Sequence, residues 1–334
     1  MNNRMITFSI IIPVYNRPDE IKELLDSLTK QTISDFEVIV VEDGSSIKCN
    51  EIIESFNERL KIIYYFQENT GPGGARNKGA SIANGNYYIF FDSDCVIPKG
   101  YIETVINKLK TNYTDAFGGP DRADSSFTSV QKAINYSMTS FFTTGGIRGG
   151  NKKLDKFHPR SFNMGISKEV FEKTKGFSSM RFGEDIDFSL RIVKSNFNTS
   201  LIKEAFVYHK RRTNLHQFFK QVFNSGIARI NLYKRHPESL KLVHLLPFIF
   251  TLGCFLLIIL SFFNYIFLIP LLLFIFIVFI DSSLNNNSIK VGTISIITSF
   301  IQLFGYGLGF FKSFWIRIVL KREEFHAYKH NFYK

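Results

Sequence analysis

Cysteine and tryptophan are scarce in this sequence. Three cysteines, at positions 49, 95 and 254, are spread over 334 residues, and no two of them form a Cys-x-x-Cys pair. This spacing argues against a disulfide framework or a zinc site, and it fits a reducing cytosolic setting. The single tryptophan is Trp315, and no Gln-x-x-Arg-Trp motif surrounds it or any other position.

A secretory signal is also missing. The apolar run from Ile6 to Val14 is short, contains Pro13 and has no small-residue cleavage site after it. We therefore expect the N-terminal domain to remain in the cytosol.

Charge and hydrophobicity are unevenly distributed. The formal net charge is +12 and 45% of the residues are hydrophobic. The first 241 residues have the composition of an ordinary globular protein, whereas the chain from Leu242 onward is apolar and rich in phenylalanine. A chain of this length can hold a sizeable domain and an appended region of different character.

Strand-length apolar runs alternate with helical patterns in the first half. Four apolar residues between Ile21 and Leu28 recur at the spacing of an amphipathic helix. Strands are expected at 8–14, 36–41, 60–66 and 87–91, and a helix rich in small residues should follow the glycines at 71–74. This alternation predicts an α/β fold with a mostly parallel sheet flanked by helices.

Two aspartates follow the fourth predicted strand directly. Asp92 and Asp94 are separated by one serine, and ligands of open α/β sheets bind at the carboxyl ends of the strands. If the chain bends after Asp92, both carboxylates face one point, which suits a hard cation such as Mg²⁺ or Mn²⁺ bound to substrate phosphates. Asp-Ser-Asp would also serve simply to end a strand and begin a turn.

The glycine-rich segment does not match a dinucleotide fingerprint. Counting from Gly71, the third glycine position is occupied by Arg76, and the segment follows the third strand instead of the first. A glycine turn with an arginine can cradle a phosphate, or it can be a plain turn with a solvated Arg76. Asp43 either caps a helix or accepts a hydrogen bond from a base, and Tyr15 is either a surface aromatic or a stacking partner for that base.

Several short motifs, taken together and in order, resemble the inverting family-two glycosyltransferases with a GT-A fold. The resemblance extends over residues 6 to 210. Its motifs are Ser9-Ile10-Ile11-Ile12-Pro13-Val14-Tyr15-Asn16, Val41-Glu42-Asp43-Gly44-Ser45, Gly73-Gly74-Ala75-Arg76-Asn77-Lys78-Gly79, Phe91-Asp92-Ser93-Asp94, Phe162-Asn163-Met164-Gly165, Gly183-Glu184-Asp185 and Tyr208-His209.

The resemblance implies a role for each matching residue. It implies a nucleotide site at Pro13, Tyr15, Asp43, Arg76 and Asp92, a metal site at Asp94 and His209, a catalytic base at Asp185, and contacts to the acceptor or donor sugar at Asn163, Gly165 and Glu184. Ordinary structural roles compete with two of these assignments. His209 would also suit a core position, and acids at 184, 185 and 187 favour the dipole of a helix that begins there.

Residues 140–165 are glycine-rich and basic. Such a segment can close over a bound donor as a lid, or it can be a surface loop. The sequence favours neither alternative.

A basic stretch precedes the apolar region. Eight lysines and arginines lie between Lys210 and Lys241, with Phe218, Phe219, Phe223 and Ile227 among them. Because this charge adjoins an apolar region, anionic lipid headgroups are the expected partner, and nucleic acid is not.

The apolar region itself is long enough for more than one membrane span. Leu242 to Ile280 predicts two spans that turn near Asn264, and Val291 to Phe311 is a third candidate. Three crossings would place the C-terminus outside, yet basic residues follow the third candidate and favour the cytosol. The third segment is therefore either a span that overrides this rule or a re-entrant or interfacial helix.

These observations predict four regions: a nucleotide-sugar glycosyltransferase domain at 1–210, a basic interfacial segment at 211–241, two to three membrane helices at 242–320 and a basic tail at 321–334. The expected protein is a multi-pass inner-membrane enzyme with a cytoplasmic catalytic domain. It would transfer a sugar from a UDP-sugar to a glycan or lipid-linked acceptor in surface polysaccharide synthesis. The alternatives are a processive polysaccharide synthase and a catalytically inactive membrane scaffold.

Overall fold

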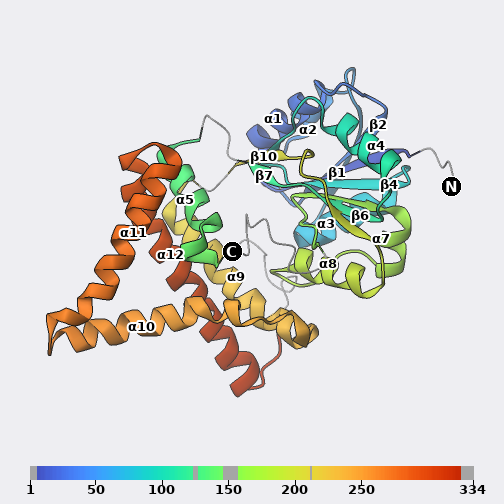
Figure 1. Cartoon of the computed structure of the whole chain (residues 1–334). Helices are drawn as coiled ribbons and strands as arrows, with labels where there is room; N and C mark the ends of the chain where they lie inside the picture. Colours follow the sequence, from blue (N-terminus) through green and yellow to red (C-terminus); the bar gives the residue numbers. More distant parts are fainter. Residues whose placement is uncertain (1–5, 123–126, 146–156, 211–212, 325–334) are drawn as a thin grey trace. The chain divides into compact units, whose positions relative to one another are not determined.

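The computed structural model describes residues 6–122, 127–145, 157–210 and 213–324, drawn in colour in Figure 1. These residues form two compact units. The first contains the described residues up to 122 together with 157–209, and the second contains 127–145 together with the described residues from 210 to 324. The centre of the predicted lid, 146–156, lies outside the described residues.

The first unit is built on a seven-stranded sheet. Its strand order is β3-β2-β1-β4-β8-β6-β9, in which β1 to β4 are parallel and β8 is antiparallel to both of its neighbours. The mostly parallel sheet predicted from the sequence is confirmed. Its strands are β1 (Phe8–Val14), β2 (Phe36–Asp43), β3 (Lys61–Gln67), β4 (Tyr87–Phe91), β6 (Ala116–Gly118), β8 (Asn163–Ser167) and β9 (Thr199–Leu201).

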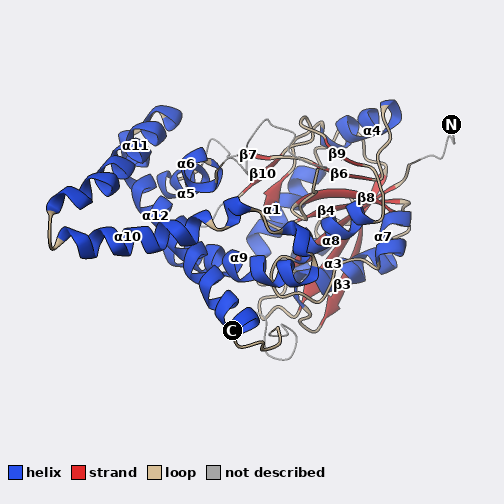
Figure 2. Cartoon of the chain, turned by 60° about the horizontal axis from the view of Figure 1, so that its bottom comes forward, coloured by secondary structure: helices blue, strands red, loops and turns tan. Residues whose placement is uncertain are grey.

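Helices cover both faces of this sheet (Figure 2). Alternate residues of β1 face opposite sides, so Ile10 and Ile12 belong to one apolar core and Ile11 to the other. Burial on both faces explains why the central strands are continuously apolar. The first core includes side chains of α1 (Pro18–Leu28), α2 (Asn50–Glu54) and α4 (Tyr101–Thr111), and the second includes side chains of α3 (Gly71–Ile82), α7 (Lys168–Thr174) and α8 (Glu184–Lys194).

The glycine-rich segment at 71–74 is the first turn of helix α3. The sequence predicts a turn at these residues, before the helix. Gly71 has a φ of +81°, a conformation that glycine adopts without strain. Pro72 follows in the first turn, where its missing N–H is not needed. The sequence pattern of a turn and that of a proline-started helix are the same here, and only the tertiary contacts distinguish them.

Pro13 lies inside β1, which has a neighbour on each side. The ladder between β1 and β4 ends at the pair Ile11–Phe90, whereas the ladder to β2 continues to Val14. A proline lacks the N–H that an interior strand position requires. Pro13 is therefore tolerated because β1 no longer pairs with β4 at that position, where the two strands separate.

A second sheet of three short strands lies beside the end of β4. It has the order β5-β10-β7, formed by Cys95–Val96, Val207–His209 and Asp121–Arg122. β10 pairs with β5 through His209 and Cys95. This pairing brings together the predicted metal ligands at 94 and 209, which lie 115 residues apart in the sequence (209 − 94).

The second unit is helical, with α12 in contact with most of its helices. Helices α5, α9, α10 and α11 all pack against α12. The unit contains α5 (Ser129–Thr139), α6 (Phe141–Thr144), α9 (Leu215–Arg235), α10 (Leu246–Ser261), α11 (Ile269–Asn286) and α12 (Ile289–Phe314), with short 3₁₀ segments at Pro237–Ser239, Leu242–His244 and Tyr265–Leu268 and a π turn at Trp315–Val319.

Helix α5 belongs to the helical unit by its contacts. It lies within the predicted catalytic domain at 1–210, but it packs with the helical unit. Ile134 and Met138 of α5 form an apolar cluster with Phe218 and Val222 of α9. The sequence could not reveal this contact, because the partners are separated by about 80 residues and none of them is unusual for a soluble helix.

Two helices of the second unit are long and apolar enough to cross a membrane by length and composition: Tyr265–Asn286 and Ile289–Val319. Helix α10 is apolar but shorter, at 16 residues. The turn predicted at Asn264 is present, and the Asn264 side chain accepts a hydrogen bond from the N–H of Ile266 at 3.0 Å. By helix length alone, this finding supports two candidate spans.

Candidate active site

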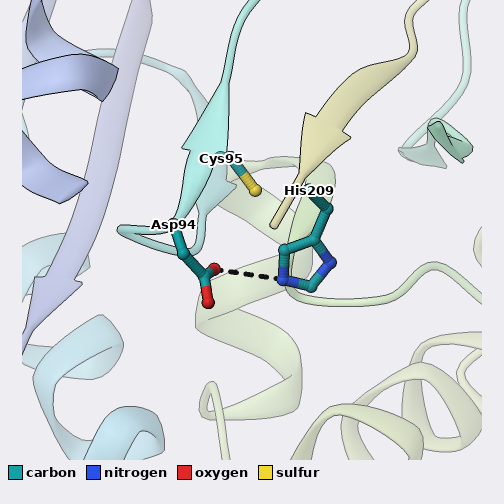
Figure 3. Close-up of side chains that lie close together, drawn as sticks. All are labelled: Asp94, Cys95 and His209. Carbon is teal, nitrogen blue, oxygen red and sulfur yellow. Dashed lines mark ion pairs between the residues drawn. The ribbon is translucent and has the colours of Figure 1, made fainter. Parts of the chain in front are cut away.

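Asp94 lies just after β4, next to a histidine from β10. The Nε2 atom of His209 is 3.0 Å from one oxygen of the Asp94 carboxylate, and Figure 3 shows the two side chains turned toward each other. The His209 ring stacks on Phe162 with its centroid 5.2 Å away, which holds the plane of the imidazole. Oxygen and nitrogen ligands of these types suit Mn²⁺ or Mg²⁺.

Cys95 completes a group of three potential ligand atoms that lie within 4.8 Å of one another. Its thiol is buried, and burial raises its pKa well above the ordinary value. The thiol lies 3.6 Å from the carbonyl oxygen of Phe162, to which it donates. Because sulfur ligands suit softer metals than Mg²⁺ or Mn²⁺, the donor set that fits a hard cation is Asp94 and His209, without Cys95.

Arg17 occupies the other oxygen of Asp94. Its Nη1 atom donates to Asp94 Oδ2 at 2.5 Å. This guanidinium supplies a positive charge at the carboxylate, on the side opposite to His209. Arg17 is not among the residues predicted from the sequence to form the site, although its position two residues after Tyr15, beyond the end of β1, was a usable signal.

One buried arginine connects the end of β4 with the beginning of α8. Arg76, from α3, donates to Asp92 at 2.6 Å and to Glu184 at 3.2 Å. Its guanidinium also lies over the ring of Phe177, 5.3 Å from the centroid. The Asp-x-Asp segment and the Glu184–Asp185 pair therefore belong to one connected network of charges.

The two acids at the start of α8 have pKa values shifted in opposite directions. Burial and then the neighbouring Asp185 charge raise the pKa of Glu184 to about 7, while Arg76 opposes this shift. Burial would also raise the pKa of Asp185, but the charge and hydrogen bond of Arg160 outweigh it and hold the pKa below the usual range. Asp185 is therefore ionised at neutral pH, whereas Glu184 is partly protonated.

Asp185 is fixed by two hydrogen bonds. Its Oδ2 atom accepts from Nε of Arg160 at 2.6 Å, and its Oδ1 atom accepts from the N–H of Ile186 at 2.8 Å. The α8 N-terminus begins after Gly183, which has a φ of +84°. Arg160 is a second residue that the sequence analysis missed, since it stands outside the motifs and no periodicity marks it.

Asp43 caps α3. Its carboxylate accepts the backbone N–H groups of Thr70 and Gly71, each at 2.8 Å, and the side-chain amide of Gln67 at 2.7 Å. This is the capping alternative derived from the sequence. Burial raises the pKa of Asp43, although the hydrogen bonds it accepts oppose the shift. Its contact with a nucleotide base stays a prediction.

The loops after β1 and β2 are tied together near Tyr15. Asn16, with a φ of +51°, accepts the N–H groups of Ser46 and Ile47 at 2.8 and 3.0 Å. Tyr15 itself is half-buried. The predicted nucleotide residues Pro13, Tyr15 and Asp43 therefore lie around one joined pair of loops, and their roles stay predictions.

Asn163 and Gly165 are buried residues of β8, and Asn163 is its first residue. The Asn163 amide accepts from the Tyr101 hydroxyl at 2.5 Å and donates to the carbonyl of Ala205 at 2.8 Å. A Cβ at Gly165 would collide with the ring of Phe117. These contacts give both residues a packing role, and their predicted contacts with a sugar remain untested.

The family of the chain follows from comparison with known proteins. The family model described as Glycosyl transferase family 2 matches residues 9–175, which is half of the chain. The chain belongs to glycosyl transferase family 2. The predicted resemblance is thus confirmed, and the matched segment contains the Asp92–Asp94 and Arg76 positions described above.

Relatives within this family share different portions of the chain. Over 249 residues it is 39% identical to the putative glycosyltransferase EpsH of Bacillus subtilis, covering 70% of this chain and 69% of EpsH. Over 102 residues it is 41% identical to glycosyltransferase GlyA of Streptococcus pneumoniae, covering 30% of this chain. The matched part of the chain spans only 15% of the length of GlyA.

A solved structure extends the comparison to almost the whole chain. The mannosyltransferase PcManGT from Pyrobaculum calidifontis, in complex with GDP-Man and Mn²⁺, matches with a TM-score of 0.67 at 15% sequence identity. The match covers 94% of this chain and 89% of PcManGT. At this identity the likeness establishes the fold, a GT-A sheet followed by long C-terminal helices.

Proposed function

We propose that this family 2 protein is an inverting, metal-dependent glycosyltransferase. It would transfer a sugar from a nucleotide-diphospho-sugar, with a UDP-sugar as the expected donor, to a glycan or lipid-linked acceptor. The observation that carries the proposal is the Arg76 bridge, which joins Asp92 at the end of β4 to Glu184 at the start of α8. The bridge supports a shared site for the donor diphosphate and for the base.

Asp185 would act as the base. Because Arg160 keeps its carboxylate ionised, it can accept the proton of the acceptor hydroxyl as that oxygen attacks the anomeric carbon. The new carbon–oxygen bond forms as the bond to the nucleotide diphosphate breaks, and the diphosphate leaves with the electron pair. One displacement inverts the anomeric centre, and no second nucleophilic carboxylate is needed.

Asp94 and His209 would hold a divalent cation. A bound Mg²⁺ or Mn²⁺ would supply Lewis-acid stabilisation of the leaving diphosphate. Asp92, held by Arg76, would orient the nucleotide beside it. Before the cation binds, Arg17 compensates the charge of Asp94.

The acceptor and the cellular place of the reaction are part of the proposal. The long apolar helices and the basic helix α9 support an enzyme that works at the inner membrane, with its catalytic domain in the cytoplasm. A lipid-linked acceptor in surface polysaccharide synthesis would reach such an enzyme from the bilayer, and anionic lipids would contact its basic residues.

The test is a donor screen with purified protein in detergent. UDP- and GDP-sugars are incubated with Mn²⁺, and released nucleotide is measured for the wild type and for Asp185→Asn. We expect release with one class of donor, and a decrease of roughly 10²–10⁴-fold in the variant with little change in donor binding. Release that is unaffected in Asp185→Asn would reject the base assignment.

The same reactions separate the alternatives when the length of the sugar product is measured beside the released nucleotide. A processive synthase would give long products, whereas the proposed enzyme adds a single sugar. No release with any donor would favour an inactive scaffold.

Metal dependence has its own measurement. Mn²⁺ binding to purified protein is followed by electron paramagnetic resonance in the wild type, Asp94→Asn and His209→Ala. We expect weaker binding in both variants, whereas Cys95→Ser should bind Mn²⁺ like the wild type because the buried thiol stays protonated. Full activity in excess chelator, or unchanged Mn²⁺ affinity in Asp94→Asn, would contradict the assignment.

A further inference from the structure

Helix α12 has the length of a membrane span, but it is packed like a core helix. Within the most apolar window of each candidate span, 44% of the residues of Ile289–Val319 are buried, against 11% of Tyr265–Asn286. α5, α9, α10 and α11 all contact α12. α12 is thus enclosed by protein on several sides, whereas α11 is exposed over most of its surface.

The contact with α9 is close and binds α12 to a charged helix. A Cβ at Gly226 of α9 would collide with the α12 backbone at Tyr306, and a Cβ at Gly309 would collide with the α9 backbone at Phe223. Farther along, Arg317 donates to the Asn231 side chain at 3.1 Å. Backbones that approach this closely leave no room for lipid between the two helices.

The charges of α9 make a membrane-spanning α12 costly. The helix carries Lys220, Arg229, Lys234 and Arg235, all of which except Arg229 are exposed. If α12 crossed the hydrocarbon, α9 would be drawn in with it. A lysine or arginine placed at the bilayer centre costs about 2.5–3.5 kcal/mol even on the lower of the published scales.

The hairpin of α10 and α11 has the opposite character. No charged side chain occurs from Leu245 to Ile280. The side chains at its tip are the most exposed of the large hydrophobic side chains among the described residues, with Phe262 and Phe263 at 84% and Tyr265 at 83%. The tip needs no water for the Ile266 N–H, because Asn264 accepts it.

The two arms of the hairpin meet α12 at different points. At the α11 end, Ser282 donates to Ser295 at 2.7 Å, and the hydroxyl of Tyr136 on α5 donates to Asp281 at 2.6 Å. At the α10 end, Phe248 stacks on Phe311 with centroids 5.5 Å apart. The arms diverge from the tip and α12 lies across their base (Figure 1; Figure 2).

We propose that the α10–α11 hairpin is the element that enters the membrane, tip first, while α12 lies along the membrane surface with α5 and α9 and does not cross. This inference deepens the membrane association included in the proposed function. Both ends of α12 then stay on the side of the catalytic unit. The basic residues at its C-terminal end, Lys312, Arg317, Lys321 and Arg322, lie on the cytosolic side that such residues favour.

The test is side-specific labelling of single exposed positions in membranes of expressing cells. Glu54→Cys reports the catalytic unit, and Lys290→Cys and Glu323→Cys report the two ends of α12. A membrane-impermeant maleimide is added to spheroplasts or to inside-out vesicles, and peptide mass spectrometry identifies the labelled position. We expect all three positions to be labelled only in inside-out vesicles.

Labelling of Lys290→Cys and Glu323→Cys from opposite sides would show that α12 crosses and would overturn the proposal. The readout does not depend on sugar transfer, so an inactive protein gives the same answer. Failure of the proposed function is therefore distinguishable from failure of this inference.

A second measurement tests the hairpin. Trp315→Phe removes the only tryptophan, and Phe263→Trp or Ile47→Trp then places one at the tip or on the exposed surface of the catalytic unit. The variants are reconstituted with phosphatidylglycerol and brominated phosphatidylcholine. We expect brominated lipid to quench emission at the tip and to leave Ile47→Trp unchanged; equal emission from both would overturn the insertion.

Discussion

Neighbouring charges determine whether the proposed base, Asp185, is ionised and how strongly it binds a proton. Asp185 is ionised because Arg160 donates to it, and Glu184 beside it is partly protonated at neutral pH because burial and Asp185 raise its pKa. The charge that one acid carries therefore affects the proton affinity of the other. Two predictions about pH dependence follow from this pair.

Removal of the Arg160 charge should raise the pKa of Asp185. In Arg160→Gln the low-pH limb of kcat/KM should move to higher pH, since an opposite charge in contact lowers a carboxyl pKa and its loss raises it. Arg160→Lys should restore part of the change, because it keeps the charge but loses the planar guanidinium. A pH profile identical to the wild type in Arg160→Gln would show that Arg160 does not act on the base.

Glu184→Gln should remove an ionisation near pH 7. In the wild type, ionised Glu184 raises the proton affinity of Asp185, so kcat/KM should increase as the pH rises through about 7. In the variant this increase should disappear and the rate at pH 8 should fall about tenfold. Retention of the inflection in Glu184→Gln would assign it to another group.

The same shift affects stability in a defined direction. A carboxyl group with a raised folded-state pKa favours the folded state below its unfolded-state pKa, and this contribution is lost as the pH rises through about 7. Glu184→Gln should therefore be more stable than the wild type at alkaline pH and similar to it near pH 4. Urea unfolding at the two pH values measures the difference.

At the scale of single elements, the start of helix α3 depends on one side chain, Asp43, from the end of strand β2. Asp43→Ala would leave the N–H groups of Thr70 and Gly71 without their acceptor. We expect a loss of about 1–3 kcal/mol in the free energy of unfolding, measured in urea. Glu54→Ala, at an exposed position on α2, is the control. A change in donor affinity in Asp43→Asn, with stability largely kept, would support the base contact predicted from the sequence.

The α9–α12 crossing depends on glycine at a defined point. Gly226→Ala places a Cβ against α12 backbone atoms that cannot rotate away, and we expect destabilisation of about 1–3 kcal/mol. Gly253→Ala is a matched control on α10, because nothing lies within 4 Å of its Cβ position. The control should be neutral or slightly stabilising. The measurement is thermal unfolding in detergent, followed by the circular dichroism of the helices. Equal unfolding midpoints for Gly226→Ala and Gly253→Ala would show that α9 and α12 are not closely packed at Gly226.

At the scale of the whole molecule, the parallel sheet and the acids Asp92 and Asp94 at its edge were predictable from the sequence. Two of the arginines that pair with acids of the site, Arg17 and Arg160, were not predicted. The central strands are apolar on both faces, which marks them directly in the sequence. Asp94 and His209 were found through motifs at strand ends. Arg160 has no such mark, since a surface arginine and a buried ion-pair arginine look alike until the fold brings an acid beside them. Arg17 was marked only by its place just beyond the end of β1.

The helical unit shows a second limit of sequence reasoning. Composition identified the apolar hairpin and the turn at Asn264, because the hairpin is a long run without charged residues that is interrupted by one asparagine. It did not indicate that α5 packs with α9, because that contact is made by ordinary apolar side chains, two from each helix. Length and hydropathy also treated α11 and α12 alike, although one is exposed and the other is packed among helices.

The placement of α5 between β7 and β8 has a consequence for how the chain is made. A ribosome produces α5 before β8 and β9 of the seven-stranded sheet, yet the phenylalanine and valine that cover Ile134 and Met138 emerge some 80 residues later. Until Phe218 and Val222 have been synthesised, the side chains of Ile134 and Met138 are exposed to solvent unless another molecule covers them. A protein ended after residue 210 would remain in that state permanently, and we expect it to precipitate unless Ile134 and Met138 are made polar.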